Sequence, residues 1–239
     1  MRKYNVVSVP VLDEEGRVVG RVTHDDILDV LLEESSEDFL MMAGTDADEL
    51  TSRSVFEVAR LRSPALLISL AAGFFMCTVV SGFEDGLNIL FVAFMPLIPL
   101  MSGNTGNQAS TVLIRGLATG HVRRDQFLHY VLREIRVGAL IGVAFACITF
   151  VVVHLVFRRH DPIEVSAAVG VAVFAAVTFA NLIGSVIPFV LTRIGLDPAI
   201  ASGPVLTAVT DTSSLAIYLT VASVAASMAG LGSMTGGHP

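Results

Sequence analysis

Asp211 is the residue of this sequence whose type and position point most directly to chemistry. It is the only Asp, Glu, Lys or Arg after Asp197, and it lies in an apolar run long enough to cross a bilayer. A carboxylate at such a depth costs ~2.5–3.5 kcal/mol on insertion scales, so it is read by default as part of an ion or proton path. On a helix, its face would be shared by the small or oxygen-bearing residues Gly203, Thr207, Ser214 and Tyr218.

A second polar stretch, residues 103–108 with the sequence GNTGNQ, lies in another run without charge. Two glycines and four hydrogen-bonding side chains suit a lipid-facing helix poorly. Polar groups at membrane depth are tolerated where they are buried in protein or line water. The alternative is close helix packing through glycine, with amides bonding between helices. On a helix, one polar face leading to Arg115 would be formed by Asn104, Asn107, Gln108 and Thr111.

Amides, hydroxyls and one carboxylate along a path suit a hard cation such as Mg²⁺, which prefers oxygen ligands and keeps several waters. A single Asp cannot build an all-protein cage, so one Asp per chain indicates a hydrated ion, or a dimer that presents two carboxylates. Proton-coupled transport and structural polar pairing remain open from residue chemistry alone. The predicted lining residues of the path are Gly103, Asn104, Thr105, Asn107, Gln108, Thr207 and Ser214.

An acidic cluster forms the third candidate site. Ten carboxylates and no Lys or Arg lie between Asp25 and Glu49. Like charges four residues apart destabilise a helix by ~0.2–0.5 kcal/mol per pair. Bound divalent cations or a basic partner would relieve this repulsion, and a solvated acidic face is the alternative. Residues at this spacing are Asp25, Asp29, Glu33 and Glu37, with Glu34 and Asp38 as a further pair.

Composition places the chain in the membrane. Its mean hydropathy is +0.72 and only 15% of its 239 residues are charged, against about 25% in soluble domains. No nucleophile–base pair, zinc-ligand spacing or phosphate-binding glycine loop occurs in the sequence, so we expect no enzyme. The net charge of −7 comes from residues 1–63, which hold 14 Asp or Glu and 7 Lys or Arg.

The order of elements follows from hydropathy and turn signals. A β-hairpin over 1–24 is expected to lead into a helix from Asp25-Asp26 to about Met42, and a second helix is expected near Ser54, at a capping box. Clustered inner arginines predict a cytoplasmic N-terminus and an external C-terminus. Five charge-poor spans are predicted, the second kinked at Pro96 and Pro99: 63–83, 86–114, 137–157, 165–192 and 199–229.

These features together resemble the MgtE family of magnesium channels, over almost the whole chain from about Tyr4 to Ala229. The most specific match is the 103–108 stretch followed by LIRGLAT at 113–119. Asp211 lies fourteen residues beyond Asp197, as the family's pore aspartate does. Residues 4–42 resemble the second half of a CBS domain. Further matches are GFE at 82–84, FANLIG at 179–184 with Pro188, and GLDPA at 195–199.

The resemblance implies roles for individual residues. Asp211 would hold hydrated Mg²⁺ in a pore at a dimer axis, and Asp197 would be a ligand at its cytoplasmic mouth. Residues near 51–62 would match the helix that plugs the pore. Thr23 and Asp26 resemble the ribose-contacting pair of a CBS module, which makes ATP a candidate ligand. Regulatory Mg²⁺ would bind between the CBS domains and the channel at Asp26, Asp29, Glu34, Glu37 and Asp38.

The sequence also departs from the family pattern. Members carry an N-terminal helical domain and a complete CBS pair, whereas this chain begins inside the second CBS module. We therefore expect a fragment or a truncated gene product. Gly203 and Ser214 stand where Asn and Gly are expected near the pore.

We predict a mostly α protein, a five-helix transmembrane bundle with a truncated cytoplasmic α/β (CBS-like) piece. The expected segments are a partial CBS domain (1–42), an acidic linker and plug-like helix (43–63), the channel domain (64–229) and a disordered tail (230–239). The predicted function is Mg²⁺ transport across the plasma membrane by a homodimeric channel gated by cytosolic Mg²⁺.

Two alternative functions remain. One is a proton- or cation-coupled secondary transporter of divalent ions such as Co²⁺ and Mn²⁺, and the other is a membrane-anchored sensor of divalent cations. The expected partners are a second copy, membrane lipids and Mg²⁺, with Co²⁺, Mn²⁺ and Ni²⁺ left open, and no nucleic acid.

Overall fold

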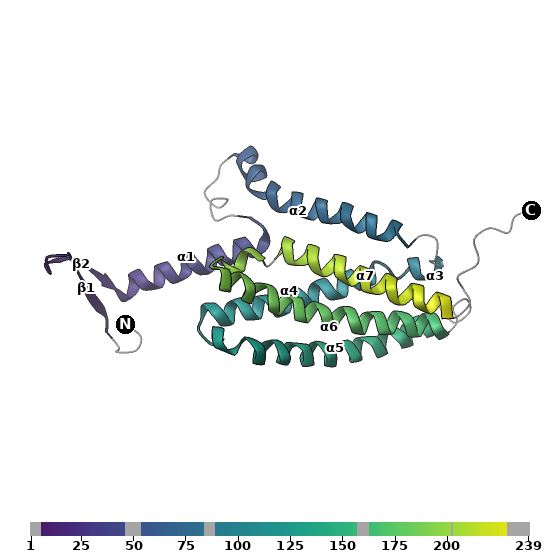
Figure 1. Cartoon of the computed structure of the whole chain (residues 1–239). Helices are drawn as coiled ribbons and strands as arrows, with labels where there is room; N and C mark the ends of the chain where they lie inside the picture. Colours follow the sequence, from purple (N-terminus) through teal and green to yellow (C-terminus); the bar gives the residue numbers. More distant parts are fainter. Residues whose placement is uncertain (1–5, 46–53, 84–88, 157–162, 202, 229–239) are drawn as a thin grey trace, which may run out of the picture.

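The N-terminal piece is a β-hairpin followed by one long helix, as the sequence predicts (Figure 1). The computed structural model describes residues 6–45, 54–83, 89–156, 163–201 and 203–228. β1 (Ser8–Leu12) pairs antiparallel with β2 (Val18–Thr23), and α1 (His24–Ala43) follows directly. α1 ends at Gly44, whose φ of 83° is the left-handed cap conformation that glycine adopts without strain.

Four helices lie side by side in the membrane part: α4 (Leu97–Ala118), α5 (Phe127–Val156), α6 (Ile163–Ile194) and α7 (Pro204–Met228) (Figure 1). α6 is the central helix and packs against α4, α5 and α7. Short side chains of α6 fill this contact. Val169, Ala172, Val173 and Ala176 are all at most 1% exposed. Short 3-10 turns, η4 (Arg124–Gln126) and η5 (Pro198–Ala201), precede α5 and α7.

The backbones of α4 and α6 touch at a pair of glycines. A methyl group on Gly184 would collide with the Gly106 carbonyl, and one on Gly106 would come within 3.3 Å of the Ala180 carbonyl oxygen. Glycine is required at such an approach because any Cβ would separate the helices. The polar stretch of α4 is therefore supported from behind by α6.

Among the described residues, four helices are long and apolar enough to cross a membrane: Val55–Ser81, Phe127–Leu155, Ile163–Ile194 and Pro204–Met228. The expected second span is not one kinked helix. It consists of α3 (Ile89–Val92), a turn over 93–96 and α4. Pro96 and Pro99 lack the N–H groups that would continue the helix, so the helix restarts at Leu97 instead. The count of five spans stays a prediction.

The first span begins earlier than expected. α2 (Val55–Ser81) runs without a break through Pro64, across the predicted boundary between the plug-like helix (43–63) and the channel domain (64–229). Ser63 donates its hydroxyl to the Ala59 carbonyl at 2.5 Å, next to the position where the proline ring interrupts helix bonding. The predicted capping box at Ser54 is wrong, because Ser54 makes no side-chain cap bond. Positions 46–53 and the expected tail at 230–239 lie outside the described residues.

Candidate functional site

Asp211 lies on α7 opposite Gly103 of α4. A methyl group on Gly103 would come within 2.8 Å of Asp211 Oδ1, so the absence of a side chain at 103 leaves room beside the carboxylate. Oδ1 is buried and has no hydrogen-bond partner among the described residues. A buried carboxylate oxygen without a donor is rare in folded proteins and indicates a missing ligand, water or ion.

Asn107 and Thr207 form the next level of the same α4–α7 contact. Asn107 Nδ2 donates to Thr207 Oγ1 at 3.3 Å, and Asn107 Oδ1 is buried without a partner in the described part of the chain. Gly103 precedes Asn107 by one turn, and Asp211 follows Thr207 by one turn. Two unpaired oxygen acceptors therefore lie at successive levels between the same two helices, an arrangement that suits a hydrated cation.

The other predicted lining residues fall into two groups. Asn104 and Gln108 are exposed on α4, together with Thr111 and Arg115, and form a polar stripe along the outer face of the chain. Thr105 and Ser214 are buried, and their hydroxyls bond to the Met101 and Asp211 backbone carbonyls of their own helices. The hydroxyl groups of Thr105 and Ser214 therefore donate within their own helices.

Gly203 is not on the Asp211 helical face, contrary to expectation. It precedes α7 and has a φ of +82°, the left-handed region that favours glycine. A methyl group there would collide with the carbonyl of Met42 in α1. Tyr218 is on α7, but it is buried and its hydroxyl donates to the Phe91 carbonyl. Gly203 thus serves the contact between α1 and the membrane part.

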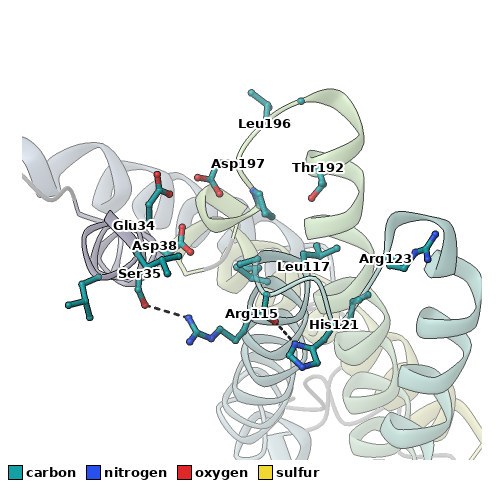
Figure 2. A pocket seen from close by; sticks show the side chains of 18 of the residues that line it. Glu34, Ser35, Asp38, Arg115, Leu117, His121, Arg123, Thr192, Leu196 and Asp197 are labelled. Carbon is teal, nitrogen blue, oxygen red and sulfur yellow. Dashed lines mark hydrogen bonds between the residues drawn. The ribbon is translucent and has the colours of Figure 1, made fainter. Parts of the chain in front are cut away.

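A cavity of about 1430 Å³ lies where α1 meets the ends of α4 and α6 (Figure 2). Figure 2 shows Glu34, Asp38 and Asp197 around one part of it, with Arg115 reaching across to Ser35. Arg115 Nη1 donates to Ser35 Oγ at 3.5 Å. Asp197 Oδ1 accepts a bond of 2.8 Å from the Ala199 backbone N–H, which stabilises the start of η5.

Asp38 is the half-buried member of this acidic group. Burial, together with the carboxylates of Asp197 and Glu34, raises the pKa of Asp38 above its usual value, while Arg115 acts in the opposite direction. The approach of Arg115 to Asp38 is not visible in the sequence, because Arg115 is far from α1 along the chain and only the fold brings it near. Asp38 and Asp197 therefore repel one another across the contact.

The remaining acidic candidates are spread along α1. Asp29, Glu34 and Glu37 are exposed. Among the described residues, no three His, Cys, Asp or Glu side chains come together to hold a metal ion. The regulatory metal site therefore stays a prediction.

Asp26 caps α1. Its Oδ2 accepts bonds of 2.7 Å from Thr23 N and 2.8 Å from Thr23 Oγ1, which lower the pKa of Asp26. This capping box engages both residues of the predicted nucleotide pair with each other. Nucleotide binding by this pair stays a prediction.

Comparison with known families agrees with these two parts of the fold. Residues 95–221 match the MgtE family, described as divalent cation transporters, and residues 1–33 match the CBS domain family. The chain belongs to the MgtE family. Members of this family are transporters, so the expectation that the chain is not an enzyme is confirmed.

Three curated relatives match almost the whole chain, and each is described as "Magnesium transporter MgtE". The Thermus thermophilus protein is 37% identical over 226 residues, the Enterococcus faecalis protein 34% over 226, and the Bacillus subtilis protein 32% over 224. The alignments cover 93–94% of this MgtE chain. The chain spans about half the length, 49%, of each relative.

Proposed function

We propose that the protein transports Mg²⁺ across a membrane through a path between α4 and α7. The observation that supports this most directly is the pair of buried, unpaired acceptors, Asp211 Oδ1 and Asn107 Oδ1, at successive levels of that contact. Hard divalent cations bind such oxygens and keep part of their water shell. The printed names of the relatives support Mg²⁺ as the cargo.

The path is completed by a second copy of the chain. One carboxylate per chain cannot surround a cation, and the stripe of Asn104, Gln108 and Thr111 is exposed on α4 in a single chain. Amide side chains left facing lipid are costly. A two-fold axis beside α4 covers them, brings two Asp211 carboxylates to one path and makes α4 the fifth membrane-crossing segment.

Cytosolic Mg²⁺ closes this path through α1. The carboxylates of Asp197, across the α1 contact, and of Glu34, on α1 itself, both act on Asp38, and Arg115 offsets only part of this repulsion. A cation between Asp38 and Asp197 favours the docked position of α1, so a high Mg²⁺ concentration favours one of two states. In this proposal α1 lies in the cytoplasm and the C-terminus lies outside.

The test is Mg²⁺ flux into proteoliposomes loaded with a Mg²⁺-sensitive dye. Asp211→Asn keeps the shape of the side chain and removes its charge, so Mg²⁺ flux or its selectivity over Ca²⁺ should be lost while the protein stays folded. Gln108→Ala, on the exposed stripe, should lower the flux less because it removes no charge.

Two results would overturn the proposal. Full Mg²⁺-selective flux through the Asp211→Asn variant would show that the carboxylate is not on the path. Flux that requires a pH gradient across the vesicle would assign the chain to the coupled transporters instead.

A further inference from the structure

The α5–α6 interface contains a second group of buried polar side chains, away from Asp211. Glu134 and Tyr130 of α5 are each 6% exposed, and Asn181 of α6 is 3% exposed. Tyr130 Oη and Asn181 Nδ2 are buried without a hydrogen-bond partner among the residues that the structure describes. Buried polar groups in folded proteins are nearly always bonded, so this group requires an explanation.

Contacts on either side place Glu134 between the two unpaired groups. The Tyr130 ring lies 5.9 Å from the Phe189 ring, and a methyl group on Gly138 would come within 2.6 Å of Asn181 Nδ2. Glu134 is four residues from both Tyr130 and Gly138, so it lies midway between them on the same face of α5.

Tyr130 and Glu134 are one helical turn apart on α5, and Asn181 of α6 lies against Gly138, one turn further along. No hydrogen bond between these three side chains is formed in the described part of the chain. Tyr130 Oη and Asn181 Nδ2 are donors, whereas an ionised carboxylate is an acceptor only. A buried water makes about three hydrogen bonds to groups of this kind.

The charge of Glu134 has little compensation from protein groups. The charged side chain that acts on it is Arg133, which is exposed and places its Cζ 5.6 Å from the centroid of the Tyr130 ring. In the described part of the chain, no salt bridge to Glu134 is formed. A buried carboxylate in this position requires solvation.

We propose that α5 and α6 hold a buried water site that bridges Tyr130, Glu134 and Asn181, and that this site positions α6 behind the polar stretch of α4. Asn181 adjoins Ala180, and Gly184 follows one turn later. Both contact Gly106 so closely that α6 cannot shift without moving α4. The site is separate from Asp211, and the proposal holds whether or not the chain conducts Mg²⁺.

X-ray hydroxyl-radical footprinting of the full chain in nanodiscs tests the water directly. Bound water produces radicals in place, so a side chain beside it is oxidised despite its burial. Tyr218 is the internal control, since it is 0% exposed and its hydroxyl is bonded to Phe91. Tyr130 should be oxidised several-fold faster than Tyr218. Equal, low rates for the two tyrosines would overturn the water site.

Variants of Glu134 test the positioning role. Glu134→Gln keeps the hydrogen bonds and should leave amide hydrogen exchange unchanged, whereas Glu134→Leu should increase exchange in α6 and in residues 103–108 of α4. Glu164→Leu changes an exposed acid of α6 and should have no such effect. Exchange that rises in α5 alone would contradict the positioning role.

The occupant is tested by replacing Na⁺ with choline at constant ionic strength. A water site predicts the same thermal stability in both salts. A stabilisation by Na⁺ that is lost in Glu134→Gln would overturn the water assignment in favour of a bound monovalent cation. The comparison of Tyr130 with Tyr218 needs no variant, so it decides the question even if Glu134→Leu fails to fold.

Discussion

Asp211 keeps one carboxylate oxygen unpaired because the residue opposite it is a glycine. Most side chains at position 103 would fill the space beside Oδ1, and a serine or asparagine there would satisfy the oxygen with a hydrogen bond. Gly103 thus contributes to the site because it leaves space beside Asp211 Oδ1. The sequence points to Asp211 by its residue type. It does not assign this role to Gly103, because the role depends on the register of α4 against α7.

The variant Gly103→Ala tests the role of the space beside Asp211 Oδ1. The added methyl group would lie 2.8 Å from Asp211 Oδ1, closer than real Cβ contacts allow, so the carboxylate must turn away. We expect Mg²⁺ flux in proteoliposomes to fall sharply. Gly73→Ala in α2 is the matched control, because nothing lies within 4 Å of its added methyl group. That variant should conduct normally and gain up to ~1 kcal/mol of stability from helix propensity. Normal flux through Gly103→Ala would contradict the proposed position of the ion.

Asp26 illustrates a residue whose structural role is clear. Bonds from Thr23 lower its pKa, so the ionised form stabilises the start of α1 at any pH above the ordinary Asp pKa. This stabilisation is lost as the pH falls through the lowered pKa. Asp26→Asn should therefore increase amide exchange in the first turns of α1 at pH 7, and the difference from the unaltered chain should vanish in acid. Asp25→Asn, in the same first turn, should have a smaller effect because Asp25 makes no such bond among the described residues. Equal effects would contradict the capping role.

At the level of helices, we expect the position of α1 to depend on charge. Its C-terminal end is fixed by close contacts, since a methyl group on Gly44 would lie 2.8 Å from Pro204 Cγ. The turn before it is held less firmly, because the carboxylates of Asp197 and of Glu34, which is on α1 itself, act on Asp38 with only Arg115 to offset them. A helix fixed at its end and repelled in the turn before that end is suited to a change of state driven by ions.

The pH dependence of α1 docking follows from Asp38. A carboxyl group whose pKa is raised by docking favours the docked state when it is protonated. Docking should therefore be strongest below the ordinary Asp pKa and weaken as the pH rises through the raised value. The protection factors of amides 34–43, which correct for the intrinsic pH dependence of exchange, should fall across this range in Mg²⁺-free buffer. Asp38→Asn should make these protection factors independent of pH there. An unchanged pH profile in that variant would rule out Asp38 as the responsible group.

The sequence predicts elements better than it predicts the contacts between them. Thr23, Asp26 and Gly44 mark the limits of α1 because caps act within a few residues, and hydropathy finds the long apolar helices. The break at 93–96 is not predicted, since two prolines are compatible with a kink or with a restart. Neither the approach of Arg115 to Asp38 nor the group of Tyr130, Glu134 and Asn181 is visible in the sequence. Both depend on how neighbouring helices pack and in which register.

The surface of the whole molecule is apolar in most of its membrane part and polar along one stripe. Leu66 and Leu70 of α2 and Leu140 of α5 are 65%, 56% and 75% exposed, as expected for side chains that meet lipid. α4 instead exposes Asn104, Gln108 and Thr111 at helical spacing. Lipid tails satisfy no hydrogen bonds, so a single chain with this stripe uncovered is unfavourable in a bilayer. The stripe is therefore the face that we propose a second copy covers.

Cysteine cross-linking tests this assembly. With Cys77 and Cys147 replaced by alanine, Gln108→Cys should form disulfide-linked dimers in membranes, because a two-fold axis beside α4 brings the two copies of position 108 together. Leu140→Cys, on the exposed apolar face of α5, should remain monomeric under the same oxidation. Cross-links at 140 but not at 108 would place the interface on α5 and leave the stripe of α4 unexplained. Cross-links at neither position, with a single chain per nanodisc, would mean that one Asp211 carboxylate acts alone. The path would then lie within one chain, between α4 and α7.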